Sequence, residues 1–320
     1  MKIIKAITWI IAIAVLVLAV LFFALKVGDT DQEAMEAKYG EAPLLRTDSG
    51  IHYRDKGNRN GTTLLLLHGS NSSLHTWERL IDELASHFRL VSFDQHGHGL
   101  TGQHPNNDYS AAARVAAGVE VLNHLGIENA VWVGNSMGGS IAWRAALLAP
   151  DQVSGLVLIN ASGAQTDEKI EPYIGAKIAR TWIGKAILPQ ITPRFMISAS
   201  LKQSIADENQ ITDELIDRYW ELVRYPGNRV AMVDGINTGR ETELWNQANR
   251  IRDNTLIIWG EQDGVIPVSH GRAFDETIPK SSLVVFPDAA HLPMEEIPNK
   301  VAGAIKAWNR DDTRRRVWRR

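Results

Sequence analysis

The residues with the most recognisable chemistry lie in the run GNSMGG at residues 134–139, which follows an apolar stretch. A serine flanked as in G-x-S-x-G is typical of a nucleophile elbow, a sharp turn from a strand into a helix. Such a turn imposes strained backbone angles on the serine and leaves no room for side chains two residues away, which explains the glycines. Ser136 is therefore the predicted nucleophile.

A serine hydroxyl needs an imidazole to remove its proton and a carboxylate to orient that imidazole. In a chain with a nucleophile elbow, the acid should follow the serine along the sequence, and the histidine should follow the acid. Asp263 lies in the loop GEQDGVIP and His291 in the loop PDAAHLP, each directly after a strand-like apolar run. Because these loops fall at the carboxyl ends of predicted strands, Ser136, Asp263 and His291 can converge on one site.

Catalysis by such a serine also requires backbone N–H groups that stabilise the developing oxyanion. The apolar run 64–67 ends in the turn His68-Gly69-Ser70-Asn71, which can present such groups. We predict that the N–H groups of Ser70 and Met137 form the oxyanion hole. The positive end of the helix that follows the nucleophile would add to this stabilisation.

Other ionisable residues near these motifs are alternatives. His68 could act as the base, but it precedes the nucleophile, so we expect it to be a buried, hydrogen-bonded turn residue. His96 and His98, in a glycine-punctuated loop, are expected to have the same structural role. Asp288 is the alternative acid.

Short apolar runs recur along the chain with longer amphipathic stretches between them, which predicts a mostly parallel sheet with helices on both faces. Two earlier segments, 44–47 and 51–55, are expected to add an antiparallel edge and to bring the sheet to eight strands. The apolar runs occupy residues 64–68, 90–94, 130–135, 156–160, 256–260 and 283–286.

About one hundred residues separate the runs that begin at 156 and 256, far more than one crossover helix requires. We therefore expect an inserted helical lid, rich in aromatic side chains. Within it, Thr212 is a predicted helix cap, and Pro226-Gly227 should end that helix. Some of the aromatic residues should line an apolar pocket, although most are expected to pack the lid against the sheet.

Residues 6–25 contain no charged side chain and would span about 30 Å as a helix, the thickness of a bilayer core. Lys2 and Lys5 precede this stretch and four acidic residues follow it between 29 and 36. This bias predicts a single transmembrane anchor with a cytoplasmic amino terminus and an extracytoplasmic catalytic domain, most simply at a bacterial inner membrane. A cleaved signal peptide is the alternative, but its apolar region is usually only about 7–15 residues long.

The expected organisation is a membrane anchor, a charged tether, a core in two parts, a lid and a basic tail. The tail is expected to be a solvated terminus, with contact to anionic headgroups as the alternative. Its arginines are Arg310, Arg314, Arg315, Arg316, Arg319 and Arg320, with Val317 and Trp318 between them. The expected boundaries are anchor 1–26, tether 27–42, core 43–163 and 251–309, lid 164–250 and tail 310–320.

Composition narrows the classes of partner. The 320-residue chain has a net charge of −3, so a nucleic-acid partner is not expected. It contains no cysteine, which excludes disulfides, thiolate metal sites and a catalytic thiol. No metal or organic cofactor is predicted, because the proposed chemistry needs none and no ligand cluster has metal spacing. The expected partners are a small ester substrate and the membrane, and the oligomeric state stays open.

Taken together, the motifs resemble those of the α/β-hydrolase superfamily, over about residues 44–309. The matching segments are HGS at 68, DQHGHGLTG at 94, GNSMGG at 134, GEQDGVIP at 260 and DAAHLP at 288. The resemblance implies an eight-stranded core with the lid between core strands 6 and 7. It also implies Ser136, Asp263 and His291 as the catalytic triad.

The resemblance bears on the reaction as well. The dehalogenases and epoxide hydrolases of this superfamily have an aspartate at the elbow, so Ser136 argues against both chemistries. Some members carry the acid one strand earlier, where this chain has Ile159-Asn160-Ala161-Ser162 and no carboxylate. Asp263 is therefore the better assignment.

The predicted reaction is hydrolysis of carboxylic esters of apolar substrates, lipid-like esters among them, through an acyl-enzyme. A carbon–carbon bond hydrolase of diketones has similar HGS and GNSMGG motifs, but here Asn71-Ser72-Ser73 replaces the Gly-Pro usual there. Cofactor-free haloperoxidases resemble the same pattern. A catalytically idle binding module on this fold is the alternative from another class.

Overall fold

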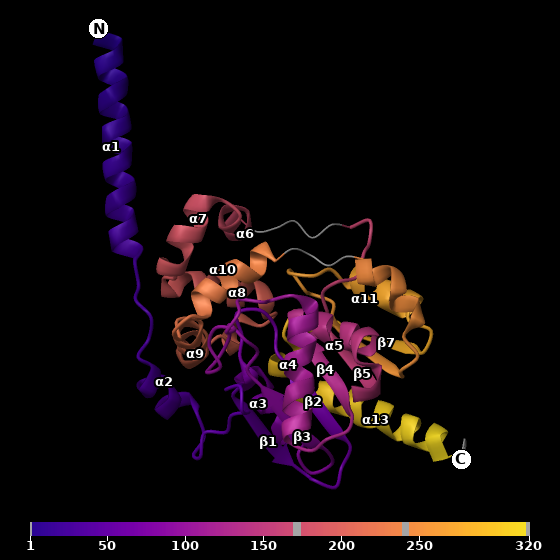
Figure 1. Ribbon diagram of the computed structural model, residues 1–320. Coiled ribbons are helices and arrows are strands. Elements are labelled where there is room, and N and C mark those ends of the chain that lie inside the picture. Colours follow the sequence, from indigo (N-terminus) through magenta and orange to yellow (C-terminus); the bar gives the residue numbers. More distant parts are fainter. Residues whose placement is uncertain (1, 169–173, 239–242, 318–320) are drawn as a thin grey trace.

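Seven strands form one sheet at the centre of the computed structural model, which describes residues 2–168, 174–238 and 243–317 (Figure 1). The strand order is β1-β3-β2-β4-β5-β6-β7, and each pairing is parallel except that of β1 with β3. The strands are β1 Tyr53–Gly57, β2 Thr63–Leu67, β3 Arg89–Phe93, β4 Ala130–Asn135, β5 Val153–Ile159, β6 Thr255–Gly260 and β7 Ser281–Phe286.

The expected eighth strand at 44–47 is not present in the described residues. Only a single antiparallel bridge, between Arg46 and His52, joins this segment to the following one. The N–H of Gly50 donates to Thr47 O, so the chain turns back immediately. The Arg46 guanidinium binds Gly50 O and Leu100 O. The prediction of eight strands was therefore wrong. Residues 44–47 do not form the expected edge strand, because the tight turn after them leaves too few residues to pair with the following segment.

The sheet is covered on both faces, which explains why its strands are continuous apolar runs. In β2, Leu65 and Leu67 point into one core cluster and Leu64 and Leu66 into the other, and all four are fully buried. On one face pack α4 (Ala111–His124), α5 (Met137–Leu148) and α11 (Val268–Thr277). On the other face pack α3 (Glu78–Leu84) and α13 (Pro298–Val317).

The helical insertion lies between β5 and β6, at the place in the chain where the lid was predicted. Thr212 caps the helix Asp213–Val223 by accepting a hydrogen bond from Leu215 N at 3.2 Å, and that helix ends before Pro226-Gly227. The helices of this lid are α6 Ile174–Ala179, α7 Trp182–Ile187, α8 Arg194–Ser204, α9 Asp213–Val223 and α10 Asn228–Asn237.

The amino-terminal helix α1 (Lys2–Leu25) projects away from the rest of the molecule (Figure 1). Its segment Ile4–Leu25 is long and apolar enough to cross a membrane. The protein does not cover its apolar side chains: Trp9, for example, is 71% exposed.

The connector after α1, expected to be a tether, lies against the lid and the core. Val27 N donates to Gln190 O at 2.9 Å, and Arg229 binds both Val27 O and Asp29. The connector then forms α2 (Gln32–Tyr39), in which Met35 is buried. These bonds fix the position of the end of α1 relative to the lid.

At the other end of the chain, α13 continues to Val317, and this end lies on the side of the molecule away from α1 (Figure 1). The helix therefore includes the first part of the predicted basic tail. Trp318, Arg319 and Arg320 lie outside the described residues.

Candidate active site

Ser136 stands at the junction of β4 and α5 with φ +53° and ψ −115°, backbone angles that a non-glycine residue rarely adopts. A Cβ on Gly134 would come 2.2 Å from Gly138 O, and one on Gly138 would come 2.0 Å from Leu67 O. The chain can therefore make this turn only with glycine at both positions. The strained angles and the two glycines are the features of a nucleophile elbow.

Asp263 and His291 are joined at the carboxyl ends of β6 and β7. His291 Nδ1 lies 2.8 Å from Asp263 Oδ2. Asp263 Oδ1 accepts hydrogen bonds from Val265 N at 2.7 Å and Ile266 N at 2.9 Å. Because an ionised carboxylate only accepts, Nδ1 carries the ring proton and Nε2 is left with a free lone pair. The structure thus places two of the three predicted residues in a hydrogen-bonded pair.

Side-chain amides join this pair to the elbow. Asn135, beside Ser136, donates to His291 O at 3.0 Å. Asn160 donates to Asp263 Oδ2 at 2.7 Å and accepts from Gly260 N at 3.2 Å. The ends of β4, β5, β6 and β7 are therefore held together by two buried asparagines.

Asn160 is a residue that the sequence analysis did not assign to the site. It occupies the position, after β5, where some relatives carry the acid, and its backbone also has a positive φ, +44°. Here an amide at that position binds the acid that comes from the next strand. The signal in the sequence that could have identified Asn160 is that an asparagine directly follows a buried strand.

Glu296, in α12 (Pro293–Glu296), was also missed. Its buried carboxylate accepts hydrogen bonds from the N–H groups of Ala290 and Leu292, which flank His291, and from Ala206 N in the lid. Burial raises the pKa of Glu296 even though these N–H groups favour the ionised form. The loop that carries His291 is thereby tied to the lid.

The predicted oxyanion donors lie next to the elbow. A Cβ on Gly69 would come 3.2 Å from Ser136 Cβ, and Ser70 Oγ lies 3.4 Å from Met137 Sδ. Met137 is the first residue of α5, where backbone N–H groups lack partners within the helix. The turn after β2 and the start of α5 therefore border the same space beside Ser136.

The alternative base is engaged elsewhere. His68 is fully buried, its Nε2 accepts from Gln95 N at 3.0 Å, and its Nδ1 donates to Gly69 O at 2.8 Å. Burial lowers the pKa of His68 and that of His98, whose ring lies 5.0 Å from it. Burial also lowers the pKa of His96, to about 4. His68 and His98 are buried, hydrogen-bonded parts of the loops, as expected from the sequence. His96 is only half-buried, and its Nδ1 has no hydrogen-bond partner among the described residues.

The alternative acid lies on the surface. Asp288 forms an exposed ion pair with Lys300 and makes no recorded contact with His291 among the described residues. Its geometry does not fit the role of orienting His291.

A second buried histidine–aspartate pair lies at the end of β3. His52 Nδ1 lies 2.7 Å from Asp94 Oδ2, and Asp94 also accepts hydrogen bonds from Leu74 N and Leu100 N. Burial alone would raise the pKa of Asp94, but the hydrogen bond from His52 and the electrostatic interactions with His52, His68 and His75 together hold this pKa well below its usual range. This pair joins three loops.

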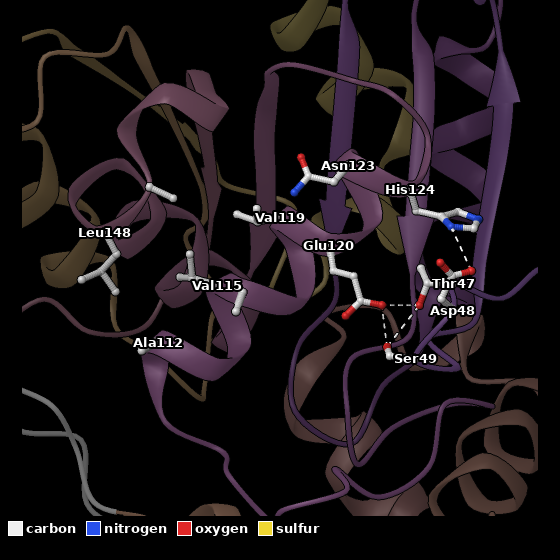
Figure 2. A pocket seen from close by; sticks show the side chains of 12 residues that line it. Thr47, Asp48, Ser49, Ala112, Val115, Val119, Glu120, Asn123, His124 and Leu148 are labelled. Carbon is white, nitrogen blue, oxygen red and sulfur yellow. Dashed lines mark hydrogen bonds and ion pairs between the residues drawn. The ribbon is translucent and has the colours of Figure 1, made fainter.

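An open hollow of about 860 Å³ lies between α4, the end of α5 and the turn at 47–49 (Figure 2). The Glu120 carboxylate at its edge accepts hydrogen bonds from Thr47 and Ser49, both at 2.5 Å. Leu148, also in its lining, is twelve residues beyond Ser136 on α5, about 18 Å along the helix axis. The hollow is therefore separate from the candidate site.

Within residues 2–168, 174–238 and 243–317, no group of three or more His, Asp or Glu side chains is placed to hold a metal ion. What the arrangement around Ser136 offers is a hydroxyl at a strained turn, a histidine oriented by a carboxylate and backbone N–H groups beside them. This set of groups can perform acyl transfer.

Comparison with known proteins agrees with this architecture. Residues 62–298 match the sequence profile of the alpha/beta hydrolase fold. The pimeloyl-[acyl-carrier protein] methyl ester esterase of Aliivibrio salmonicida is 26% identical over 253 residues, which are 77% of this chain and 90% of the relative.

Two solved structures show the same fold. A thermophilic esterase from Thermogutta terrifontis superposes with a TM-score of 0.70 at 25% identity, covering 84% of this chain and 97% of that one. A bacterial membrane phospholipase A superposes with a TM-score of 0.67 at 22% identity, covering 97% of this chain and 98% of that one. From the profile match, the sheet topology and the elbow at Ser136, we conclude that the chain belongs to the α/β hydrolase fold family.

Proposed function

We propose that the protein is a serine hydrolase that cleaves carboxylic esters of apolar substrates through an acyl-enzyme intermediate. The observation that carries this proposal is the 2.8 Å hydrogen bond between His291 and Asp263, in loops tied to the elbow of Ser136. The esterases among the similar proteins support an ester as the substrate class.

In the proposed reaction, His291 Nε2 takes the hydroxyl proton of Ser136 as Oγ attacks the ester carbonyl carbon. The N–H groups of Ser70 and Met137 stabilise the oxyanion, and the hydrogen bond to Asp263 stabilises the imidazolium. His291 then returns the proton to the departing alcohol. Water attacks the acyl-enzyme with His291 again as base, which releases the acid and restores Ser136.

The test is hydrolysis of p-nitrophenyl esters of graded chain length by the full chain in detergent micelles. We expect activity to be lost in Ser136→Ala and retained in Ser140→Ala, whose hydroxyl lies one turn further along the same helix. The preferred chain length would then indicate the size of the acyl pocket.

Labelling with a serine-reactive fluorophosphonate separates the alternatives. Labelling that depends on Ser136, without turnover of any ester, would favour the carbon–carbon hydrolase and call for diketone substrates. If folded protein neither labels nor hydrolyses esters, the binding module becomes the better explanation.

We also propose that α1 stays attached and anchors the enzyme, with residues 27–320 outside the cytoplasm. The bonds that fix Val27 and Asp29 to the lid support an uncleaved helix, because cleavage near residue 25 would leave this docked segment as a new terminus. An alkaline phosphatase reporter fused after residue 40 should be active in a bacterial host. An inactive reporter would contradict this topology.

A further inference from the structure

Most of the large apolar side chains that are exposed outside α1, in the part of the chain that the structure describes, belong to the lid. Five of the eight large apolar side chains that are exposed in that part of the described chain fall between residues 178 and 196. Trp182 is 80% exposed and Phe195 63% exposed. Single exposed apolar residues are ordinary, but Ile178, Trp182 and Ile183 lie on the adjoining helices α6 and α7, and such a group marks a surface that contacts something else. The five are Ile178, Trp182, Ile183, Phe195 and Met196.

The charged residues within this part of the lid are all basic, although two of them, Arg194 and Lys202, form ion pairs with acidic residues outside it. Residues 174–206 contain five basic residues and no Asp or Glu, although the whole chain has a net charge of −3. Arg180 and Lys185, on either side of Trp182, are exposed. A tryptophan among apolar and basic side chains is the composition found at the boundary of an anionic membrane.

The local fold presents these side chains in a fixed arrangement. The Thr181 hydroxyl accepts a hydrogen bond from Gly184 N at 3.0 Å and donates to Ile178 O at 2.8 Å, which fixes the turn between α6 and α7. A Cβ on Gly184 would come 1.9 Å from Ile178 O, so α6 and α7 meet as closely as glycine permits.

The end of the candidate anchor lies directly beside this surface. Lys26 forms an antiparallel bridge with Ile191, and Val27 N donates to Gln190 O at 2.9 Å. In Figure 1, α6 and α7 lie at the level of the last turns of α1, at the end of the body nearest to that helix. A bilayer that contained α1 would therefore have its surface at α6 and α7.

We propose that the α6–α7 face of the lid docks on the bilayer that holds α1. Trp182 and Ile183 lie at the boundary between headgroups and acyl chains, and Arg180 and Lys185 bind anionic headgroups. This inference rests on the proposed membrane anchoring. If the lid docks in this way, an apolar ester reaches it from the lipid phase.

The test uses the absence of cysteine from the chain. Trp182→Cys, made in the full chain and incorporated as one copy per nanodisc, is labelled with an environment-sensitive fluorophore. The matched control is Ser86→Cys. Ser86 is exposed and lies before the amino-terminal end of β3, whereas the lid contacts loops at the carboxyl ends of the parallel strands. Both variants also carry Ser136→Ala, so no lipid is hydrolysed and the result does not depend on the proposed activity.

We expect nitroxide-labelled lipids to quench the probe at 182 several-fold more strongly than the probe at 86, and iodide in the water to quench it several-fold less. Equal behaviour at the two positions would overturn the proposal. Protection from iodide without quenching by the lipid would indicate that protein, and not lipid, covers the probe, and would also overturn the proposal. If the chain does not enter nanodiscs, both the anchoring by α1 and the docking of the lid on the bilayer are rejected.

The basic residues are tested in the same background. Arg180→Gln combined with Lys185→Gln should weaken the lipid quenching at 182 in anionic nanodiscs and leave it unchanged in zwitterionic ones. An equal effect in both lipids would show that headgroup charge is not recognised.

Discussion

The described part of the chain contains two buried histidine–aspartate pairs of nearly the same geometry, and one of them is linked to the elbow that carries Ser136. His291 lies 2.8 Å from Asp263 and His52 lies 2.7 Å from Asp94, and both aspartates are buried. The first pair lies at the ends of β6 and β7 and is tied to the elbow through Asn135 and Asn160. The second holds two loop N–H groups beside β3. A histidine–aspartate hydrogen bond is thus not in itself evidence of catalysis. Whether such a pair can act on a nucleophile depends on the residues that surround it.

The largest expected difference between the pairs is in turnover. We expect Asp263→Asn to lower kcat for ester hydrolysis by roughly 10⁴-fold, because an amide favours the wrong tautomer of His291. The measurement is kcat of the purified full chain, with the thermal midpoint as a control for folding. A loss smaller than about tenfold would mean that Asp263 does not orient the base.

Asp94→Asn should instead lower stability. The carboxylate holds His52 and two backbone N–H groups, so we expect a loss of about 3 kcal/mol or more at neutral pH, with kcat of the folded fraction little changed. The lowered pKa of Asp94 means that its contribution is present above the unfolded value and is lost as the pH falls. Unfolding of wild type and variant at pH 7 and near pH 3 should therefore show a difference that shrinks in acid. A constant difference would contradict this account.

Asn160→Gly should have a smaller effect on turnover. Glycine tolerates the positive φ at this position, so the variant removes the side-chain amide with its hydrogen bonds to Asp263, Ala290 O and Gly260 N. Only the bond to Asp263 acts directly on the acid that orients His291. We expect kcat to fall by about tenfold, the value of one hydrogen bond to a charged group, with KM unchanged. A change in KM alone would assign Asn160 to substrate binding.

Asp288→Asn should change activity least, by less than about twofold, since an exposed ion pair contributes little. The measurement is the same ester assay, beside Asp263→Asn. If the two variants lost activity equally, the assignment of the acid would have to be reconsidered.

Local motifs made much of the site predictable. The glycines around Ser136 are required by close backbone approaches, so the elbow can be recognised from six residues. Asp263 and His291 follow apolar runs that are buried strands. The eighth strand was predicted wrongly because the residue types in segments 44–47 and 51–55 do not reveal how tightly the chain turns between them.

Residues that act through distant partners could not be found in this way. Glu296 binds N–H groups on both sides of His291 and one in the lid, a separation of ninety residues in one of these bonds. The charged stretch after α1 suggested a tether, yet Arg229 and Gln190 of the lid hold it. The contacts with the lid depend on how the lid folds back over the core, and a local sequence pattern does not encode this.

The sequence by itself determined the fold family, the elbow, the order of the candidate triad and the apolar amino-terminal helix, because each depends on residue types at short spacing. Only the tertiary structure decided that a second histidine–aspartate pair forms away from the elbow, and that α1 ends against the lid. These depend on long-range packing, in which segments far apart in the chain become neighbours.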